Sequence, residues 1–105
     1  MAKFKHTQGL ASIEFEKTIT VWCPLGNDYY TATIGVYFRP GEYLMDYLDE
    51  EDYFKELSGE KLIIEDLLAK VFDHYMKTYE PKELTITVNA TNATHFPVKV
   101  CKYFY

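Results

Sequence analysis

The residue best suited to covalent chemistry in this sequence is Cys23. It follows Trp22 at the end of a segment with strand periodicity and directly precedes a cluster of turn residues, Pro24 to Asp28. Functional side chains are often presented where a rigid scaffold meets a loop, and a cysteine thiolate at such a place is a nucleophile. A cysteine beside a tryptophan is more often a small buried hydrophobe. From these residues alone both interpretations stay open.

The other groups that could carry chemistry are scattered along the chain. The sequence has no Gly-rich phosphate loop, no H-E-x-x-H or G-x-S-x-G motif, and no Cys/His set spaced for zinc. We therefore expect no metal site. Cys101 falls in the last predicted strand, where we expect a buried structural role. Each histidine is expected on the surface or on a helix face rather than as a ligand: His6, His74 and His95.

Strands and helices must position these groups. The alternation of apolar and polar residues predicts strands over residues 13–23, 29–38, 84–88 and 96–100. Apolar residues at helical spacing predict a helix, or two short helical pieces, over Leu44–Leu57. A stronger helix is predicted to begin with Ser58 as its N-cap and to end at Tyr79, close to a proline. The resulting order is β-β-α-α-β-β.

This order indicates an α+β fold in which both helices lie on one face of an antiparallel sheet. At 105 residues the chain is expected to form a single domain, 1–105, with residues 1–11 as a loosely ordered N-terminal arm. The opposite face and the edges of a sheet rich in Tyr and Phe would be uncovered. Because open strand edges favour association, we expect a homo-oligomer.

Composition limits the classes of function. Apolar residues make up 48% and aromatic residues 17% of the chain, which predicts a folded protein. The net charge of -5 argues against a simple phosphate-coating binder. No apolar run approaches the about 20 residues needed to cross a membrane, and the N-terminus does not resemble a secretory signal. We therefore expect a soluble, cytoplasmic protein with free thiols.

The negative charge is concentrated in residues 42–60, which carry eight acidic side chains and one lysine. A solvated helix face is the simpler interpretation of this pattern. The alternative is that the acidic face points away from an anionic partner, which the near-neutral remainder of the chain would then meet.

The segments around Cys23 resemble the active-site strand pair of the QueF family, the 7-cyano-7-deazaguanine nitrile reductases. The pair Cys23-Pro24 and the triplet Ala32-Thr33-Ile34 both fall in the family's register. Residues 62–68 resemble the family's helix with a His-Glu pair, and Glu65 stands in the place of the glutamate that anchors the base. The resemblance covers about residues 12–90. It implies the tunnelling fold, whose unit is β-β-α-α-β-β. It also implies assembly into a homo-oligomeric ring, as a pentamer or a decamer.

The chain departs from the reductases at several segments, and these departures indicate which branch of the family it resembles. The reductases carry a Glu-Ser-Lys-Ser-Leu-Lys run, which residues 43–48 do not match, and an Arg-Gly-Gly segment, which residues 90–94 replace. Without them the chain looks more like the archaeal QueF-like amidinotransferases, which convert the nitrile of 7-cyano-7-deazaguanine in tRNA into the amidine of archaeosine. The family's aspartate position is Tyr30 here, with Asp28 as the nearest acid, and its histidine position is Ile64.

The resemblance implies a covalent mechanism and therefore an enzyme. Cys23 would add to the nitrile carbon to give a thioimide, Asp28 would protonate the nitrogen, and Glu65 would accept hydrogen bonds from the guanine-like edge. Ammonium would be the co-substrate, and no cofactor would be needed. From its position alone, Glu65 is equally a solvated first-turn glutamate. Two alternatives stay open: an NADPH-dependent reductase of queuosine biosynthesis, and a non-catalytic tunnelling-fold module that has lost the acid and the histidine.

Overall fold

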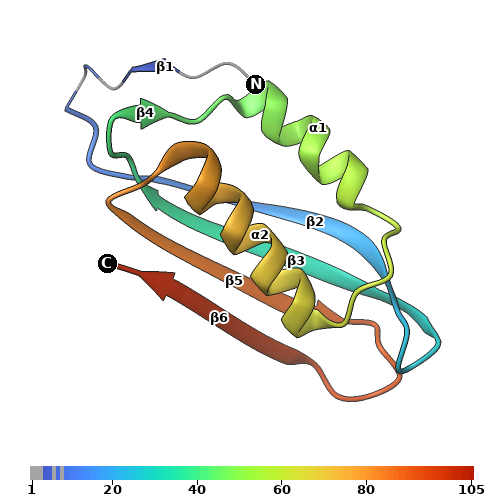
Figure 1. The fold of residues 1–105 in the computed structure, drawn as a ribbon. Helices are drawn as coiled ribbons and strands as arrows, with labels where there is room; N and C mark the ends of the chain where they lie inside the picture. Colours follow the sequence, from blue (N-terminus) through green and yellow to red (C-terminus); the bar gives the residue numbers. More distant parts are fainter. Residues whose placement is uncertain (1–3, 6, 8) are drawn as a thin grey trace.

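The main element of the computed structural model, which describes residues 4–5, 7 and 9–105, is a four-stranded antiparallel sheet in the order β2-β3-β5-β6 (Figure 1). Its strands are β2 (Ile13–Cys23), β3 (Asp28–Arg39), β5 (Glu83–Thr91) and β6 (Val98–Phe104). The predicted strands are confirmed, and β6 extends further toward the C-terminus than the sequence pattern indicated.

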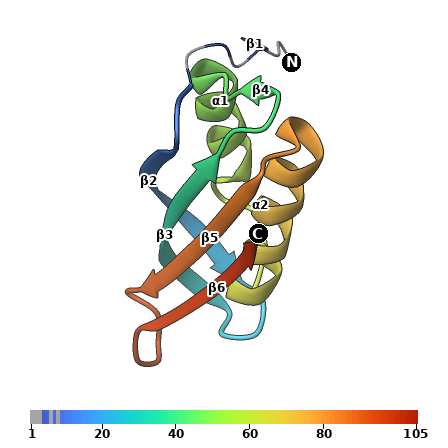
Figure 2. The ribbon, with the colours of Figure 1, turned by 90° about the vertical axis from the view of Figure 1, so that its left-hand side faces the viewer.

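Two helices cover one face of the sheet, as Figures 1 and 2 show from two directions. Helix α1 (Tyr47–Leu57) packs against β2, and α2 (Ile64–Tyr79) packs against β5 and β6. Asp46 caps α1, because its carboxylate accepts hydrogen bonds from the backbone N–H groups of Leu48 and Asp49. The α+β fold with both helices on one face is confirmed.

Alternation along each strand gives the sheet two different faces. The helix-facing side chains form the core together with the buried faces of α1 and α2, and Ala32, Ile34 and Val88 are wholly buried there. The opposite face is rich in threonine: Thr18, Thr20, Thr31, Thr33, Thr85, Thr87 and Thr91. Aromatic side chains share this face: Trp22, Tyr29, Tyr37 and Tyr103. Tyr29 and Tyr103 are more than half exposed, so the uncovered face combines threonine with accessible aromatic rings.

The second helix begins later than the sequence predicts. Ser58 is the C-cap of α1 and not the N-cap of α2, which begins at Ile64. Residues 59–62 run beside β2 and make three backbone hydrogen bonds of 2.8 to 2.9 Å with Thr20 and Trp22. Because this segment pairs with a strand, it has no helical conformation, and it also covers the end of the β2 edge that we expected to be open.

The two cysteines are both free, and they occupy different surroundings. Cys23 is half-buried at the end of β2, whereas Cys101 is exposed. The expected buried role of Cys101 is wrong, because the register of β6 pairs it with Thr87 on the threonine-rich face, away from the helices.

The N-terminal segment is described in part. Phe4 and Lys5 form the short strand β1 (Phe4–Lys5), which pairs with β4 (Tyr43–Leu44). Positions 1–3, 6 and 8, and with them His6, lie outside the described residues.

Candidate active site

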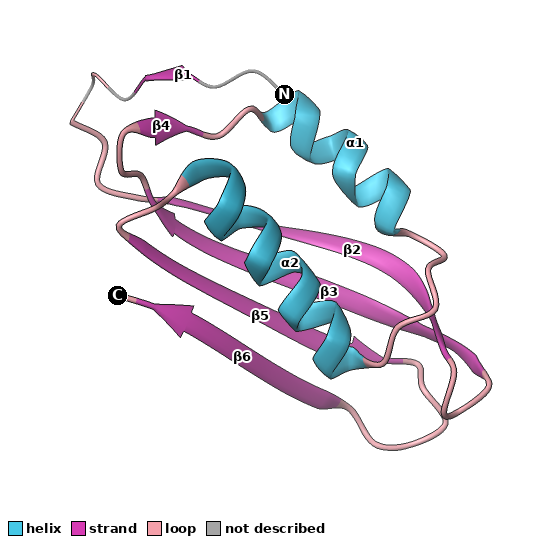
Figure 3. Ribbon diagram, in the orientation of Figure 1, coloured by secondary structure: helices cyan, strands magenta, loops and turns pink. Residues whose placement is uncertain are grey.

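A cavity of about 350 Å³ opens at the end of the sheet where β2 turns into β3. The turn between β5 and β6 and the start of α2 reach the same end of the molecule (Figure 3). The cavity brings together the three residues that the sequence singled out, Cys23, Asp28 and Glu65, from three different elements. Most of its remaining walls are apolar: Leu25, Ile63, Ile64, Ala90, Ala93 and Val98.

The hairpin register sets Cys23 directly opposite Asp28. The two residues are Cα partners in the β2–β3 ladder, so their side chains project from the same face of the sheet. Asn27 closes the turn with its backbone N–H, which donates to the Cys23 carbonyl at 2.8 Å, and adopts the left-handed conformation with a φ of 54°. Tyr30, at the family's acid position, pairs instead with Val21. The acid nearest to the thiol in the ladder is therefore Asp28.

The surroundings of the Cys23 sulfur suit a nucleophile. The backbone N–H of Gly26 donates to Sγ at 3.4 Å, a contact that stabilises a thiolate. The side chain is half-buried and lines the cavity. Asp28 is exposed at the cavity rim, where its Oδ1 accepts the Tyr29 backbone N–H at 2.7 Å. Thiol and carboxylate are thus both accessible to a small molecule.

Glu65 reaches the cavity because the segment before α2 is tied to the sheet. Leu62 belongs to the backbone segment beside β2, and its carbonyl accepts a hydrogen bond of 2.7 Å from the hydroxyl of Tyr30. Glu65 is exposed in the first turn of α2, and its carboxylate has no hydrogen-bond or ion-pair partner among the residues that the structure describes. It is therefore available to accept hydrogen bonds from a ligand.

Tyr30 is the buried hydroxyl of this cavity. Burial, followed by the negative charges of Cys23 and Glu65, raises the pKa of Tyr30 to about 12. The hydroxyl therefore keeps its proton at neutral pH and holds the start of α2 through Leu62. Ile64, at the family's histidine position, lines the cavity without a titratable group.

The sequence analysis missed the contribution of the β5–β6 loop. Ala93, Thr94 and His95 line the cavity, although His95 was expected only as a histidine on the surface or on a helix face. The antiparallel pairing of β3 with β5 sets Thr31 beside Thr91, so both hairpin turns fall at the same end of the sheet. The predicted order β-β-α-α-β-β did not say which strands pair, so it did not place this loop at the cavity.

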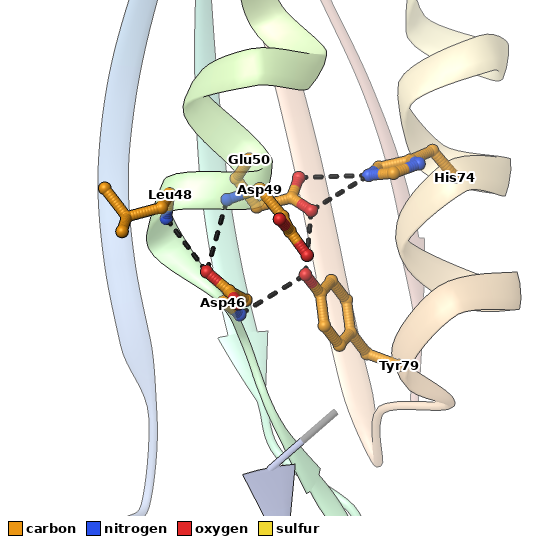
Figure 4. A network of polar contacts seen from close by, with 6 residues as sticks. All are labelled: Asp46, Leu48, Asp49, Glu50, His74 and Tyr79. Atoms are coloured by element: carbon orange, nitrogen blue, oxygen red, sulfur yellow. Dashed lines mark hydrogen bonds and ion pairs between the residues drawn. The ribbon is translucent and has the colours of Figure 1, made fainter. Parts of the chain in front are cut away.

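A second set of polar side chains joins α1 to the C-terminal half of α2 (Figure 4). Glu50 is only 3% exposed, and its carboxylate accepts hydrogen bonds from His74 Nε2 at 3.0 and 3.1 Å and from the Tyr79 hydroxyl at 2.8 Å. The Tyr53 ring stacks on His74 with centroids 3.7 Å apart. For Glu50, the expectation of a solvated acidic face is therefore wrong, because α1 turns this carboxylate toward α2.

The described residues show no metal cluster and no membrane helix. No three His, Cys, Asp or Glu side chains in that part of the chain gather as they would around a metal ion. None of the helices described there has the length and apolar character required to traverse a bilayer.

The fold matches the crystal structure of the archaeosine synthase QueF-Like in the apo form. The match has a TM-score of 0.83 and covers 91% of this chain and 95% of that chain, at 12% sequence identity. No protein-family model matches the sequence, and the search of curated proteins gave no significant match. The structural match establishes that this chain has the tunnelling fold that its sequence predicted.

Proposed function

We propose that this chain is a QueF-like amidinotransferase that acts on the nitrile of 7-cyano-7-deazaguanine in tRNA and forms the amidine of archaeosine. The observation that carries the proposal is the meeting of Cys23, Asp28 and Glu65 in one cavity, from the end of β2, the start of β3 and the first turn of α2. The shared fold with an archaeosine synthase supports the same substrate class.

The chemistry uses these three side chains in separate roles. Cys23 Sγ forms a bond to the nitrile carbon, and the displaced π electron pair moves to the nitrogen, which takes a proton from Asp28. Ammonia then attacks the thioimide carbon, the C–S bond breaks, and the amidine leaves while the thiol is restored. No step changes the oxidation state of the carbon, so the reaction needs no reductant. Glu65 accepts hydrogen bonds from the donor edge of the base and selects against bases that lack those donors.

The size of the cavity favours amidine formation over reduction. Ligand pockets have volumes of about 300–1,000 Å³, and this cavity, at about 350 Å³, lies at the small end of that range. It suits a single heteroaromatic base. A nicotinamide dinucleotide would extend well beyond it, and residues 90–94, three of which line the cavity, offer no basic side chain for its phosphates.

A homo-oligomer is part of the proposal. In the described sheet, β6 is an edge strand, and residues 59–62 cover only the last part of the other edge, at β2. We expect the sheets of neighbouring copies to join through these edges into a ring of five copies, or two stacked rings. Sedimentation at micromolar concentration should show this assembly, and a monomer would contradict it.

Intact mass measurement after incubation with 7-cyano-7-deazaguanine tests the covalent step. We expect a single adduct per chain, absent from Cys23→Ala and retained in Cys101→Ala, the matched control at the other free thiol. An unchanged mass of the wild-type protein would contradict the catalytic proposal and favour a binding module.

A second assay separates the two enzymatic branches. The protein is supplied with ammonium and tRNA that carries 7-cyano-7-deazaguanine, and in parallel with the free base and NADPH. We expect amidine in the tRNA. NADPH oxidation that depends on the free base would show a reductase instead.

A further inference from the structure

We propose that His95 is the general base that removes the proton from the Cys23 thiol. This inference rests on the proposed function, because it concerns the same covalent step. Its first support is location: His95 lies in the β5–β6 loop and lines the same cavity as Cys23. Among the described residues that line this cavity, His95 is the only imidazole.

The loop that carries His95 is fixed against the Cys23 hairpin. Asn92 adopts a left-handed conformation with a φ of 58°, and its side-chain amide donates to Thr31 Oγ1 on β3 at 3.1 Å. Thr94 Oγ1 and Cys23 Sγ each lie 3.7 Å from the place that a Cβ on Gly26 would occupy. The loop and the thiol are therefore both neighbours of Gly26.

The hydrogen bond of His95 uses Nδ1 and leaves Nε2 to accept the thiol proton. Nδ1 lies 2.6 Å from the Phe96 carbonyl oxygen. A carbonyl oxygen only accepts hydrogen bonds, so Nδ1 carries the proton, and Nε2 of the neutral ring keeps its lone pair. A backbone carbonyl on Nδ1 is also the kind of contact that orients a histidine for proton transfer.

His74 is the contrasting case, because its Nε2 is already engaged. Its Nε2 faces the buried carboxylate of Glu50 at 3.0 Å, and its side chain is only 14% exposed. His95, by contrast, is exposed on the cavity side and has Nε2 available. Of the two described histidines, only His95 lines the cavity that holds Cys23.

The proposed step balances without any further reactant. His95 Nε2 takes the thiol proton as Sγ bonds to the nitrile carbon, while the nitrile nitrogen takes its proton from Asp28. His95 holds the proton through the lifetime of the thioimide. When ammonia displaces the sulfur, the imidazolium returns the proton to Sγ, and the proton released by ammonia restores Asp28.

The variant His95→Asn tests this role with the loop contact kept. The asparagine amide can replace Nδ1 as the donor to the Phe96 carbonyl, but it supplies no base at the position of Nε2. The first measurement is the rate of alkylation by iodoacetamide from acidic to alkaline pH, read at each cysteine by peptide mass. Cys101 is an internal reference, because it lies on the opposite face of the sheet.

We expect His95→Asn to slow alkylation of Cys23 about tenfold or more near neutral pH, with no change at Cys101. Lys99→Gln, at an exposed position of β6 outside the cavity, should leave the rate unchanged. The second measurement is the rate of adduct formation with 7-cyano-7-deazaguanine. We expect His95→Asn to slow adduct formation about tenfold or more, and Lys99→Gln to leave it unchanged.

The two measurements separate this inference from the proposed function. If His95→Asn forms the adduct at the wild-type rate and Cys23 is alkylated as before, the role of His95 is overturned and the amidinotransferase proposal stands. If the wild-type protein forms no adduct while alkylation of Cys23 still depends on His95, the proposed function fails and the proton transfer is supported.

Discussion

The two ends of α2 carry the same residue types in opposite states. At its start, Glu65 and the nearby Cys23, Asp28 and His95 line an open cavity. In its second half, His74 and Tyr79 enclose the buried carboxylate of Glu50. In the closed set the carboxylate is bonded by two side chains, whereas Glu65 has no hydrogen-bond or ion-pair partner among the described residues. A carboxylate and a histidine at hydrogen-bond distance therefore mark the structural cluster here, and the candidate active site is the place where such groups are left free for a ligand.

This contrast predicts the largest effect on stability at Glu50. Replacement by Ala leaves His74 and Tyr79 without their buried partner, and we expect Glu50→Ala to lower the free energy of unfolding by about 3–5 kcal/mol. Urea denaturation measures the change.

The matched control for this variant is Glu51→Ala. Glu51 is the next residue of α1, but its side chain is 50% exposed in an ion pair with Lys17, and its loss should leave the unfolding midpoint nearly unchanged. Equal effects of the two variants would show that the Glu50 cluster is hydrated in solution, and the contrast between the two ends of α2 would disappear.

At the start of α2, beside the cavity, a substitution should change ligand affinity rather than stability. Glu65→Gln removes a charged acceptor from the cavity, and we expect the affinity for 7-cyano-7-deazaguanine to drop by about 1.5–3 kcal/mol, roughly 10- to 100-fold. Calorimetric titration on a Cys23→Ala background measures the non-covalent affinity, and thermal unfolding should be unaffected.

Asp66→Asn is the control for Glu65, because it removes the neighbouring first-turn carboxylate, which is exposed and outside the cavity. It should change neither affinity nor stability. A Glu65 variant that loses stability but binds the base normally would assign Glu65 to the helix start and not to substrate recognition.

Tyr30 lines the cavity and also stabilises the fold, and its replacement should give a smaller change in free energy than those at Glu50 and Glu65. It holds Leu62 through a hydrogen bond of 2.7 Å, so Tyr30→Phe should cost about 1 kcal/mol of unfolding free energy near neutral pH. Because folding raises the pKa of this hydroxyl from 10.0 to about 12, its contribution is complete below pH 10 and is lost as the pH rises through about 12.

The difference between wild type and Tyr30→Phe should therefore be constant below about pH 10 and shrink from about pH 10 to about pH 12. Tyr37→Phe, in the same strand but on the opposite face, is the control and should show no such dependence. A constant difference across this range would mean that Tyr30 ionises normally in the folded protein.

Much of the fold could be predicted because it follows from local patterns. Alternating residues such as Ile19 and Val21 in β2 determine which side of a strand is buried, and the residue before Pro81 ends α2. These signals depend on near neighbours in the chain. The presence of Cys23 at the end of a strand, before a turn, was equally visible.

The errors have a common physical origin in contacts between segments distant in sequence. Ser58 has the side chain of an N-cap, yet the pairing of residues 59–62 with β2 delays the helix to Ile64. Glu50 belongs to an acidic segment, yet the way α1 lies against α2 buries it. Local propensity contributes less than such long-range packing, so it does not decide these positions.

For the candidate site, the sequence by itself determined the residue types: a cysteine before a turn, an acid close behind it and a glutamate in the first turn of the second helix. The tertiary structure alone decided how these residues meet. Asp28 pairs with Cys23 in the hairpin, and the Tyr30 hydroxyl bonds to the Leu62 carbonyl just before α2. The loop that carries His95 borders the same cavity. These relations depend on hairpin register and on the meeting of three chain segments at one end of the sheet. Hydrogen bonds between strands and the burial of side chains fix that meeting, and neither is encoded within a single segment.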